Sequence, residues 1–274
     1  MAKTTKKSKA TWGHDRSRHG AWFVCAALCI TVLMIASLLS CAGSQKQREL
    51  AENHLNIGTA HVEGGDYNAA LKELLEAEKY TQENPKIHYY LAVAYFGKGY
   101  SEKAIEECET AVRLKPDYST AYDFLGTLYS SRGQYDKAIA AYNSALANIL
   151  YETPDISLYN MGRAYASKGD YRRAIMKYQE AAVKATRPEL LPLIEKEMGK
   201  ASYAQGDIDG AIGHFKKSTE LVPNLVESYF WLGECYSKQK RVPEARRAYE
   251  MVVKLAPASD FGLKAKQALQ LINI

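Results

Sequence analysis

Apolar and small residues recur along residues 51–259 at the spacing of amphipathic helices, and this pattern itself repeats about every 34 residues. Six small residues stand at equivalent positions, which we call the anchors: Gly58, Ala92, Gly126, Gly162, Gly199 and Gly233. Twelve residues after each anchor comes an alanine: Ala70, Ala104, Ala138, Ala174, Ala211 and Ala245. Such a period indicates a repeat protein in which each unit buries its apolar face against its neighbours.

Each unit predicts two antiparallel helices, A and B, with the anchor on helix A facing the alanine on helix B. A glycine seven residues after each of the first five anchors suits the left-handed turn between them: Gly65, Gly99, Gly133, Gly169 and Gly206. The sixth unit has Lys240 there, so its turn departs from the pattern. Pro116, Pro223 and Pro257 are predicted to close helix B of units two, five and six.

The pattern resembles the tetratricopeptide repeat, in six copies over residues 51–259. The resemblance implies an all-α superhelix, and the amphipathic pattern after the sixth repeat predicts a C-terminal capping helix over residues 260–274. Ten tyrosines occupy three recurrent positions and are expected in the core. They are Tyr95, Tyr129, Tyr165 and Tyr236, then Tyr67, Tyr135 and Tyr171, then Tyr142, Tyr178 and Tyr249.

The first forty residues have the pattern of a targeting signal. A basic stretch over residues 1–20 precedes the uncharged, mostly apolar segment 21–40. As a helix of about 1.5 Å per residue, that segment would reach roughly 30 Å, enough to span a bilayer. A cleaved signal, a retained anchor and a lipoprotein signal all place the rest of the chain outside the cytoplasm.

The junction at residues 38–41, Leu-Leu-Ser-Cys, resembles the bacterial lipobox. The resemblance implies removal of residues 1–40 as a signal peptide, acylation of Cys41 and a polar tether over residues 41–50. Ala42 rather than aspartate follows the cysteine, which favours the outer membrane, facing the periplasm. The alternatives are a plain signal cut after Ala42, giving a secreted periplasmic protein, and an inner-membrane anchor.

Charge and chemistry exclude several classes of function. Residues 1–20 hold six basic residues and one acidic, so residues 41–274 carry 30 of each sign, and nucleic-acid binding is not expected. Cys108 and Cys235 fall on apolar helical positions and are expected as buried thiols. His54 and His61 are too widely spaced for a helical metal pair, and no nucleophile motif occurs. We therefore predict no enzyme activity, catalytic residue, metal, cofactor or small-molecule substrate.

The face of helix A that lines the inner groove of such a superhelix carries aromatic and charged residues. This composition suits an extended or helical peptide segment of a protein partner. The alternative is that several of these side chains pack against the adjacent helix. The predicted groove residues are Tyr89, Phe96, Asp123, Tyr159, Arg163, Lys196, Lys200, Tyr203, Phe230 and Glu234.

Repeats behind a lipobox, with the Tyr-Glu-Thr-Pro connection at residues 151–154, resemble the type IV pilus biogenesis and stability lipoproteins called pilotins. The resemblance implies an adaptor that binds secretin subunits and promotes their outer-membrane localisation and assembly. One alternative is another periplasmic repeat scaffold, for example for cell-wall enzymes. Another is a hydrolase regulated through the repeats, although few residues outside them are left to build an active site.

Overall fold

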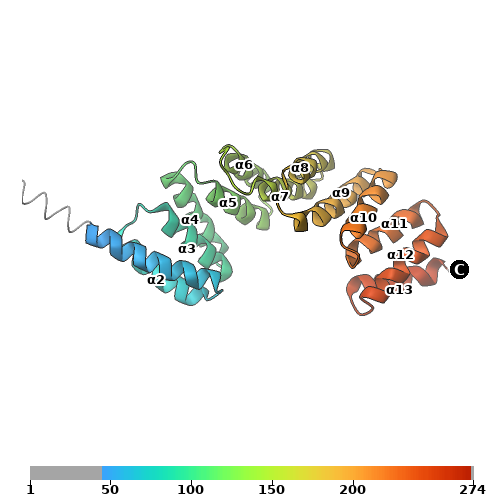
Figure 1. Cartoon of the computed structure of the whole chain (residues 1–274), viewed down its shortest axis with the longest axis horizontal. Helices are drawn as coiled ribbons and strands as arrows, with labels where there is room; N and C mark the ends of the chain where they lie inside the picture. Colours follow the sequence, from blue (N-terminus) through green and yellow to red (C-terminus); the bar gives the residue numbers. More distant parts are fainter. Residues whose placement is uncertain (1–44, 273–274) are drawn as a thin grey trace, which may run out of the picture.

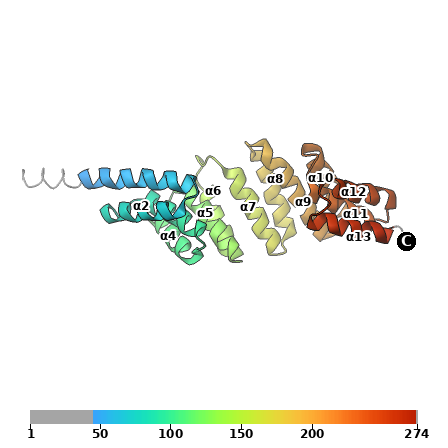
Figure 2. The same ribbon diagram turned by 90° about the horizontal axis from the view of Figure 1, so that it is seen from below.

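The computed structural model describes residues 45–272, which form an elongated, bowed row of helices (Figure 1). The described chain runs from one end of the row to the other, and the view turned by 90° shows the helices stacked side by side along its length (Figure 2). This part of the chain contains no strand. The expected all-α tetratricopeptide-repeat superhelix is confirmed.

Six helix pairs follow the predicted repeats. The first pairs the N-terminal helix, residues 45–63, with α2 (Tyr67–Tyr80). The others are α3 (Pro85–Gly97) with α4 (Ser101–Leu114), α5 (Ser119–Ser131) with α6 (Tyr135–Leu146), α7 (Pro154–Ser167) with α8 (Tyr171–Lys184), α9 (Leu191–Gln205) with α10 (Ile208–Leu221), and α11 (Val226–Lys238) with α12 (Val242–Leu255). A 3₁₀ turn, η1 (Pro188–Leu190), precedes α9, and α13 (Asp260–Ile272) follows the last pair.

The turns inside the pairs have the predicted backbone. Gly65, Gly99, Gly133, Gly169 and Gly206 all have φ between 71° and 87°. Lys240 takes the same left-handed conformation, with φ 59°. Its turn also keeps the hydrogen bond that closes the glycine turns, here from the Arg241 N–H to the Tyr236 carbonyl at 2.9 Å. The sixth turn is therefore built like the others, without the residue that suits it best.

The glycine anchors lie directly against a large side chain of helix B. A Cβ atom at Gly126 would lie 2.5 Å from the Tyr142 ring, and the other glycine anchors similarly face the residue sixteen positions later. Those residues are Leu74, Tyr142, Tyr178, Phe215 and Tyr249. The predicted contact between each anchor and its alanine stays a prediction; the structure adds this second contact, which is with a ring in four repeats and with Leu74 in the first. In repeat two, where the anchor is Ala92, the corresponding residue is the smaller Cys108.

The ten recurrent tyrosines contribute to the core to different degrees. Tyr129, Tyr142, Tyr178, Tyr236 and Tyr249 are buried, whereas the other five are half-buried. Cys108 and Cys235 are buried free thiols, as expected. Pro116, Pro223 and Pro257 each follow the end of a B helix, at α4, α10 and α12. The apolar face of α13 packs on α12 and α11 through Phe261, Ala265 and Leu269, among others, so it covers the end of the last repeat.

The N-terminal segments lie partly outside the described residues. The targeting signal, Cys41 and Ala42 are outside them, so their predicted roles stay predictions. Residues 45–50 of the predicted polar tether are helical and continue directly into the first repeat, with residues 45–49 exposed. Within residues 45–272, none of the helices combines the length and apolar character needed to cross a bilayer.

Candidate functional site

The inner face of the row is built by the A helices. Direct contacts link α5 to α7, α7 to α9 and α9 to α11, so these helices form one continuous layer. Every predicted groove residue stands three residues before, one after or four after its anchor. These positions are four and three residues apart, so they form one stripe along each A helix.

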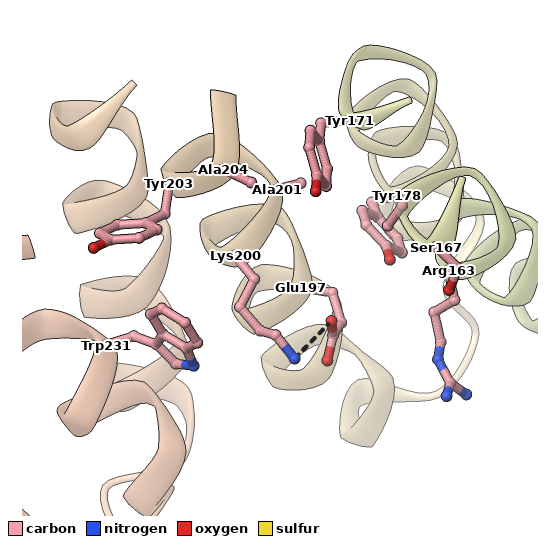
Figure 3. Close-up of a pocket in the computed structure, with 11 residues that line it drawn as sticks. Arg163, Ser167, Tyr171, Tyr178, Glu197, Lys200, Ala201, Tyr203, Ala204 and Trp231 are labelled. Carbon is pink, nitrogen blue, oxygen red and sulfur yellow. Dashed lines mark ion pairs between the residues drawn. The ribbon is translucent and has the colours of Figure 1, made fainter. Parts of the chain in front are cut away.

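Three of the predicted residues meet at a hollow between repeats four and six. Arg163, Lys200 and Tyr203 line a cavity of about 410 Å³. In Figure 3 the ion pair of Lys200 and Glu197 lies at its centre, between Trp231 from α11 and Arg163 from α7. Tyr178 from α8 forms part of the wall. The hollow thus combines aromatic rings with both signs of charge.

Two lining residues of this hollow, Glu197 and Lys200, belong to a cluster of ion pairs. Lys196 Nζ lies 2.7 Å from a Glu227 oxygen and 3.3 Å from a Glu197 oxygen. Lys200 Nζ lies 3.2 Å from Glu227 and 3.3 Å from Glu197. Burial opposes ionisation of Glu227, but the hydrogen bond and charge of Lys196 outweigh it and lower the pKa of Glu227. Both lysines are thereby neutralised within the fold and fix α9 against α11.

Arg163 carries the free positive charge of the hollow. Among the described residues no carboxylate lies within 4.0 Å of its guanidinium, which sits 5.9 Å above the centre of the Tyr159 ring. Its side chain is exposed. Arg163 and Ser167 also line a neighbouring cavity of about 300 Å³, with Thr127 and Ser130. The two hollows therefore adjoin at Arg163 and form one groove, which we call the inner groove.

Two polar groups in the wall of the inner groove have no hydrogen-bond partner in the described part of the chain. They are the Tyr178 hydroxyl and the Trp231 indole N–H, both buried. Burial is the main cause that raises the pKa of Tyr178, so its hydroxyl stays a neutral donor. Tyr203 contacts Trp231, with ring centres 5.3 Å apart, and Lys238 lies 4.8 Å above the Tyr203 ring. The wall of the inner groove thus holds two buried donors without a partner among the described residues.

Asp123 connects the groove to the long connection before repeat four. Its carboxylate accepts a hydrogen bond from the Ser157 hydroxyl, which lies 3.3 Å from the Tyr151 hydroxyl in that connection. Burial raises the pKa of Asp123, and the Ser157 hydrogen bond only partly offsets this. The Tyr-Glu-Thr-Pro segment therefore braces the inner face from one side.

The remaining predicted residues lie apart from the inner groove. Tyr89 and Phe96 belong to an aromatic cluster around Phe124 at the N-terminal end, with ring centres 6.0 Å and 5.8 Å from that ring. At the other end, Phe230 packs among the rings of Trp231, Tyr249 and Phe261, 5.1 to 6.0 Å away. Glu234 accepts a 2.6 Å hydrogen bond from the Tyr249 hydroxyl. For Phe230 and Glu234, packing between helices is the role that the structure shows.

Several residues at or beside the inner groove were not predicted from the sequence. Glu197 and Trp231 both stand two residues before their anchors, directly beside the predicted stripe, and Phe124 does so in the N-terminal cluster. That shared register is the signal that could have found them. Glu227 offered no such signal, because it reaches Lys196 only through the stacking of α9 on α11.

Comparisons with known proteins agree with this architecture. Models of the tetratricopeptide repeat match residues 58–99 and 199–240, residues 85–118 and 226–259, and residues 125–189. The Hsp70-Hsp90 organizing protein 3 of Arabidopsis thaliana is 21% identical over 216 residues. The match covers 75% of this chain, and the chain spans 36% of that protein's length.

Two solved structures match almost over their whole length. PilF of Pseudomonas aeruginosa superposes with a TM-score of 0.68 at 15% identity, over 81% of this chain and 99% of PilF. PilW, described as a widely conserved type IV pilus biogenesis factor, gives 0.70 at 20% identity, over 79% of this chain and 98% of PilW. At these identities the likeness shows a shared fold. The chain belongs to the tetratricopeptide repeat family, whose helix pairs form scaffolds for protein interaction.

Proposed function

We propose that this protein is an outer-membrane-anchored adaptor that binds secretin subunits and promotes their assembly for type IV pilus biogenesis. The observation that carries the proposal is the inner groove, where exposed Arg163 shares the lining with Tyr178 and Trp231, whose buried donors have no partner among the described residues. An extended segment of a partner would supply carbonyl oxygens and side chains to these groups. The proposed role of the groove is therefore recognition.

The choice of partner rests on three further observations. The lipobox-like Leu-Leu-Ser-Cys motif supports acylation at Cys41, which would place the repeats at a membrane surface. The Tyr-Glu-Thr-Pro connection resembles that of the pilotin lipoproteins and braces Asp123 through Ser157. The fold extends over nearly the whole of PilF and PilW. Together these features favour a secretin over other clients.

The partner is tested in a deletion strain. We expect loss of surface pili and secretin monomers in the inner membrane, measured by electron microscopy and by immunoblotting of membrane fractions. Normal secretin multimers in that strain would contradict the secretin role. The protein would then be better explained as a scaffold for other periplasmic proteins, such as cell-wall enzymes.

The groove is tested separately with purified components. Arg163→Glu reverses a charge that has no ion-pair partner among the described residues, so folding should be unaffected. Tyr203→Ala removes an aromatic wall. Each should weaken secretin binding at least about tenfold, since aromatic and arginine side chains dominate interface energies. Val183→Ser, on the outer helix α8 where Val183 is 88% exposed, is the matched control. Equal affinity of all three variants and the wild type would place the interface elsewhere.

A further inference from the structure

A histidine lies between carboxylates from two flanking helices at the junction of repeats one and two. His88 Nδ1, on α3, lies 2.7 Å from Glu107 Oε2 on α4 and 4.0 Å from Glu78 Oε1 on α2. One ligand atom from each of the three residues falls within 4.8 Å of the other two. His88 is only 5% exposed, whereas both glutamates are half-buried.

The second ring nitrogen of His88 fixes where its proton lies. His88 Nε2 is 2.9 Å from the Gln82 carbonyl oxygen, which can only accept a hydrogen bond, so Nε2 carries the hydrogen. At 2.7 Å, a second ring proton on Nδ1 would be donated to Glu107, whereas in the neutral ring Nδ1 directs its lone pair toward two carboxylates. That arrangement is repulsive unless a cation lies among the three groups. A ring N–H donated to a backbone carbonyl is also the usual outer support of a metal-bound histidine.

Two other histidine–glutamate pairs occupy equivalent positions but lack the second unpaired carboxylate of the His88 cluster. His54 and Glu73 occupy the same register one repeat earlier, with Nδ1 and Oε2 2.8 Å apart, and belong to no such three-residue group in the described chain. In repeat five the order is exchanged, because Glu195 lies on helix A and His214 on helix B. There Lys217 also pairs with Glu195 and supplies the positive charge. No lysine or arginine of the described residues lies within 4.0 Å of Glu78 or Glu107.

We propose that Glu78, His88 and Glu107 bind a divalent transition-metal ion, with zinc the best fit. Two carboxylates and one neutral imidazole balance a charge of two and leave a fourth position for water. Tetrahedral zinc with ligands at about 2.0–2.1 Å separates them by about 3.3 Å, between the two distances that His88 Nδ1 makes now. The partly exposed glutamates give the ion a way in. The bound ion would fasten α2, α3 and α4 together.

The test uses the full chain without a histidine tag, in mild detergent. Calorimetric titration with zinc chloride should give one site that depends on these three residues, and zinc should raise the melting temperature. Cobalt chloride should give visible absorption bands of an imidazole–carboxylate site. Glu78→Gln and Glu107→Gln should each weaken zinc binding at least about tenfold, since even loss of an outer-shell partner of a metal ligand costs about that much.

His54→Gln is the matched control and should bind zinc like the wild type, because it alters the equivalent pair that lacks a third ligand. Equal zinc affinity of wild type, Glu78→Gln and Glu107→Gln would overturn the proposal. So would a wild-type protein that binds no zinc at micromolar concentration, in which case a proton on His88 is the cation. If His88→Gln does not fold, the Glu78→Gln result decides, since that side chain is 29% exposed.

Discussion

Lys240 occupies a backbone conformation that costs a side-chain-bearing residue free energy. Its φ of 59° lies in the left-handed region, where the Cβ atom approaches the carbonyl oxygen at a cost of roughly 1–2 kcal/mol. Lys240→Gly should therefore raise the free energy of unfolding by about 1 kcal/mol, measured by urea denaturation. Gly206→Ala, at φ 87°, is the converse and should lower it by a similar amount. Two variants that both change stability in the same direction would contradict this account.

The contact between anchor and ring makes a second prediction at the residue scale. Gly126→Ala would place a Cβ atom 2.5 Å from Tyr142, so the ring or the helix must shift. Overpacking of this kind costs about 1–3 kcal/mol. Repeat two combines a larger anchor, Ala92, with a smaller partner, Cys108, at the same two positions.

A double-mutant cycle tests whether the two positions are coupled. Tyr142→Cys alone should be strongly destabilising because it leaves a cavity. Combined with Gly126→Ala, the loss should be smaller than the sum of the two single losses by about 1 kcal/mol or more. Strict additivity in thermal and urea unfolding would show that the ring accommodates the methyl group without strain.

At the scale of the helix pair, most of the structure was predictable because its determinants are local. The small-residue anchors, the turn glycines and the closing prolines each act within one repeat, and they located all six pairs, while the final helix followed from its own amphipathic pattern. The large side chain that covers the anchor was not predicted, since the rotation of helix B about its axis decides which of its residues, here Tyr142, lies over Gly126. Periodicity alone does not fix that rotation.

Contacts between pairs were harder to predict. Lys196 and Glu227 are 31 residues apart and meet only because α11 stacks on α9. For the same reason the sequence showed that Lys196 and Lys200 are on the inner face, but not that both are neutralised there. Whether the predicted groove residues bind a partner stays a prediction, now centred on Arg163 and Tyr203.

The ion pairs of α9 give the molecule a defined sensitivity to acid. Glu195 is 2% exposed; burial favours its protonated form, but hydrogen bonds from His214 and Lys217 outweigh burial and lower its pKa. A carboxyl whose pKa is lower in the folded state contributes stability above its unfolded pKa of about 4.5 and loses it as the pH falls through the folded value. Stability should therefore decline below about pH 4.5.

Glu195→Gln isolates this contribution. At pH 7 the variant should be less stable than the wild type by about 1–3 kcal/mol, because two donors lose their charged acceptor. The difference should shrink as the pH falls below about 4.5, where the wild-type carboxyl becomes protonated. Glu220→Gln, at an exposed position on α10, should match the wild type throughout. A difference in unfolding free energy between Glu195→Gln and the wild type that stays constant from pH 7 to pH 3 would mean that Glu195 acts through packing rather than through charge.

At the scale of the whole molecule, location and recognition are assigned to different ends of the chain. The proposed lipid is on Cys41, four residues before the first described residue of the first helix, whereas the inner groove lies along repeats three to six. An anchor on the same membrane as the secretin raises the effective concentration of the groove by orders of magnitude, without adding a contact. Modest groove affinity would then suffice in the cell.

This separation predicts opposite behaviour of two variants. Cys41→Ser should lose acyl labelling and leave the outer-membrane fraction, yet bind the isolated secretin with wild-type affinity. Arg163→Glu should stay in the outer-membrane fraction and lose affinity in solution. Both should reduce secretin multimers in cells, and raising the expression of Cys41→Ser should partly restore them, because concentration then replaces the anchor. If Cys41→Ser stayed in the outer-membrane fraction, the interpretation of residues 38–41 as a lipobox would be wrong. If Cys41→Ser failed to bind the isolated secretin in solution, the lipid would be needed for recognition as well as for location.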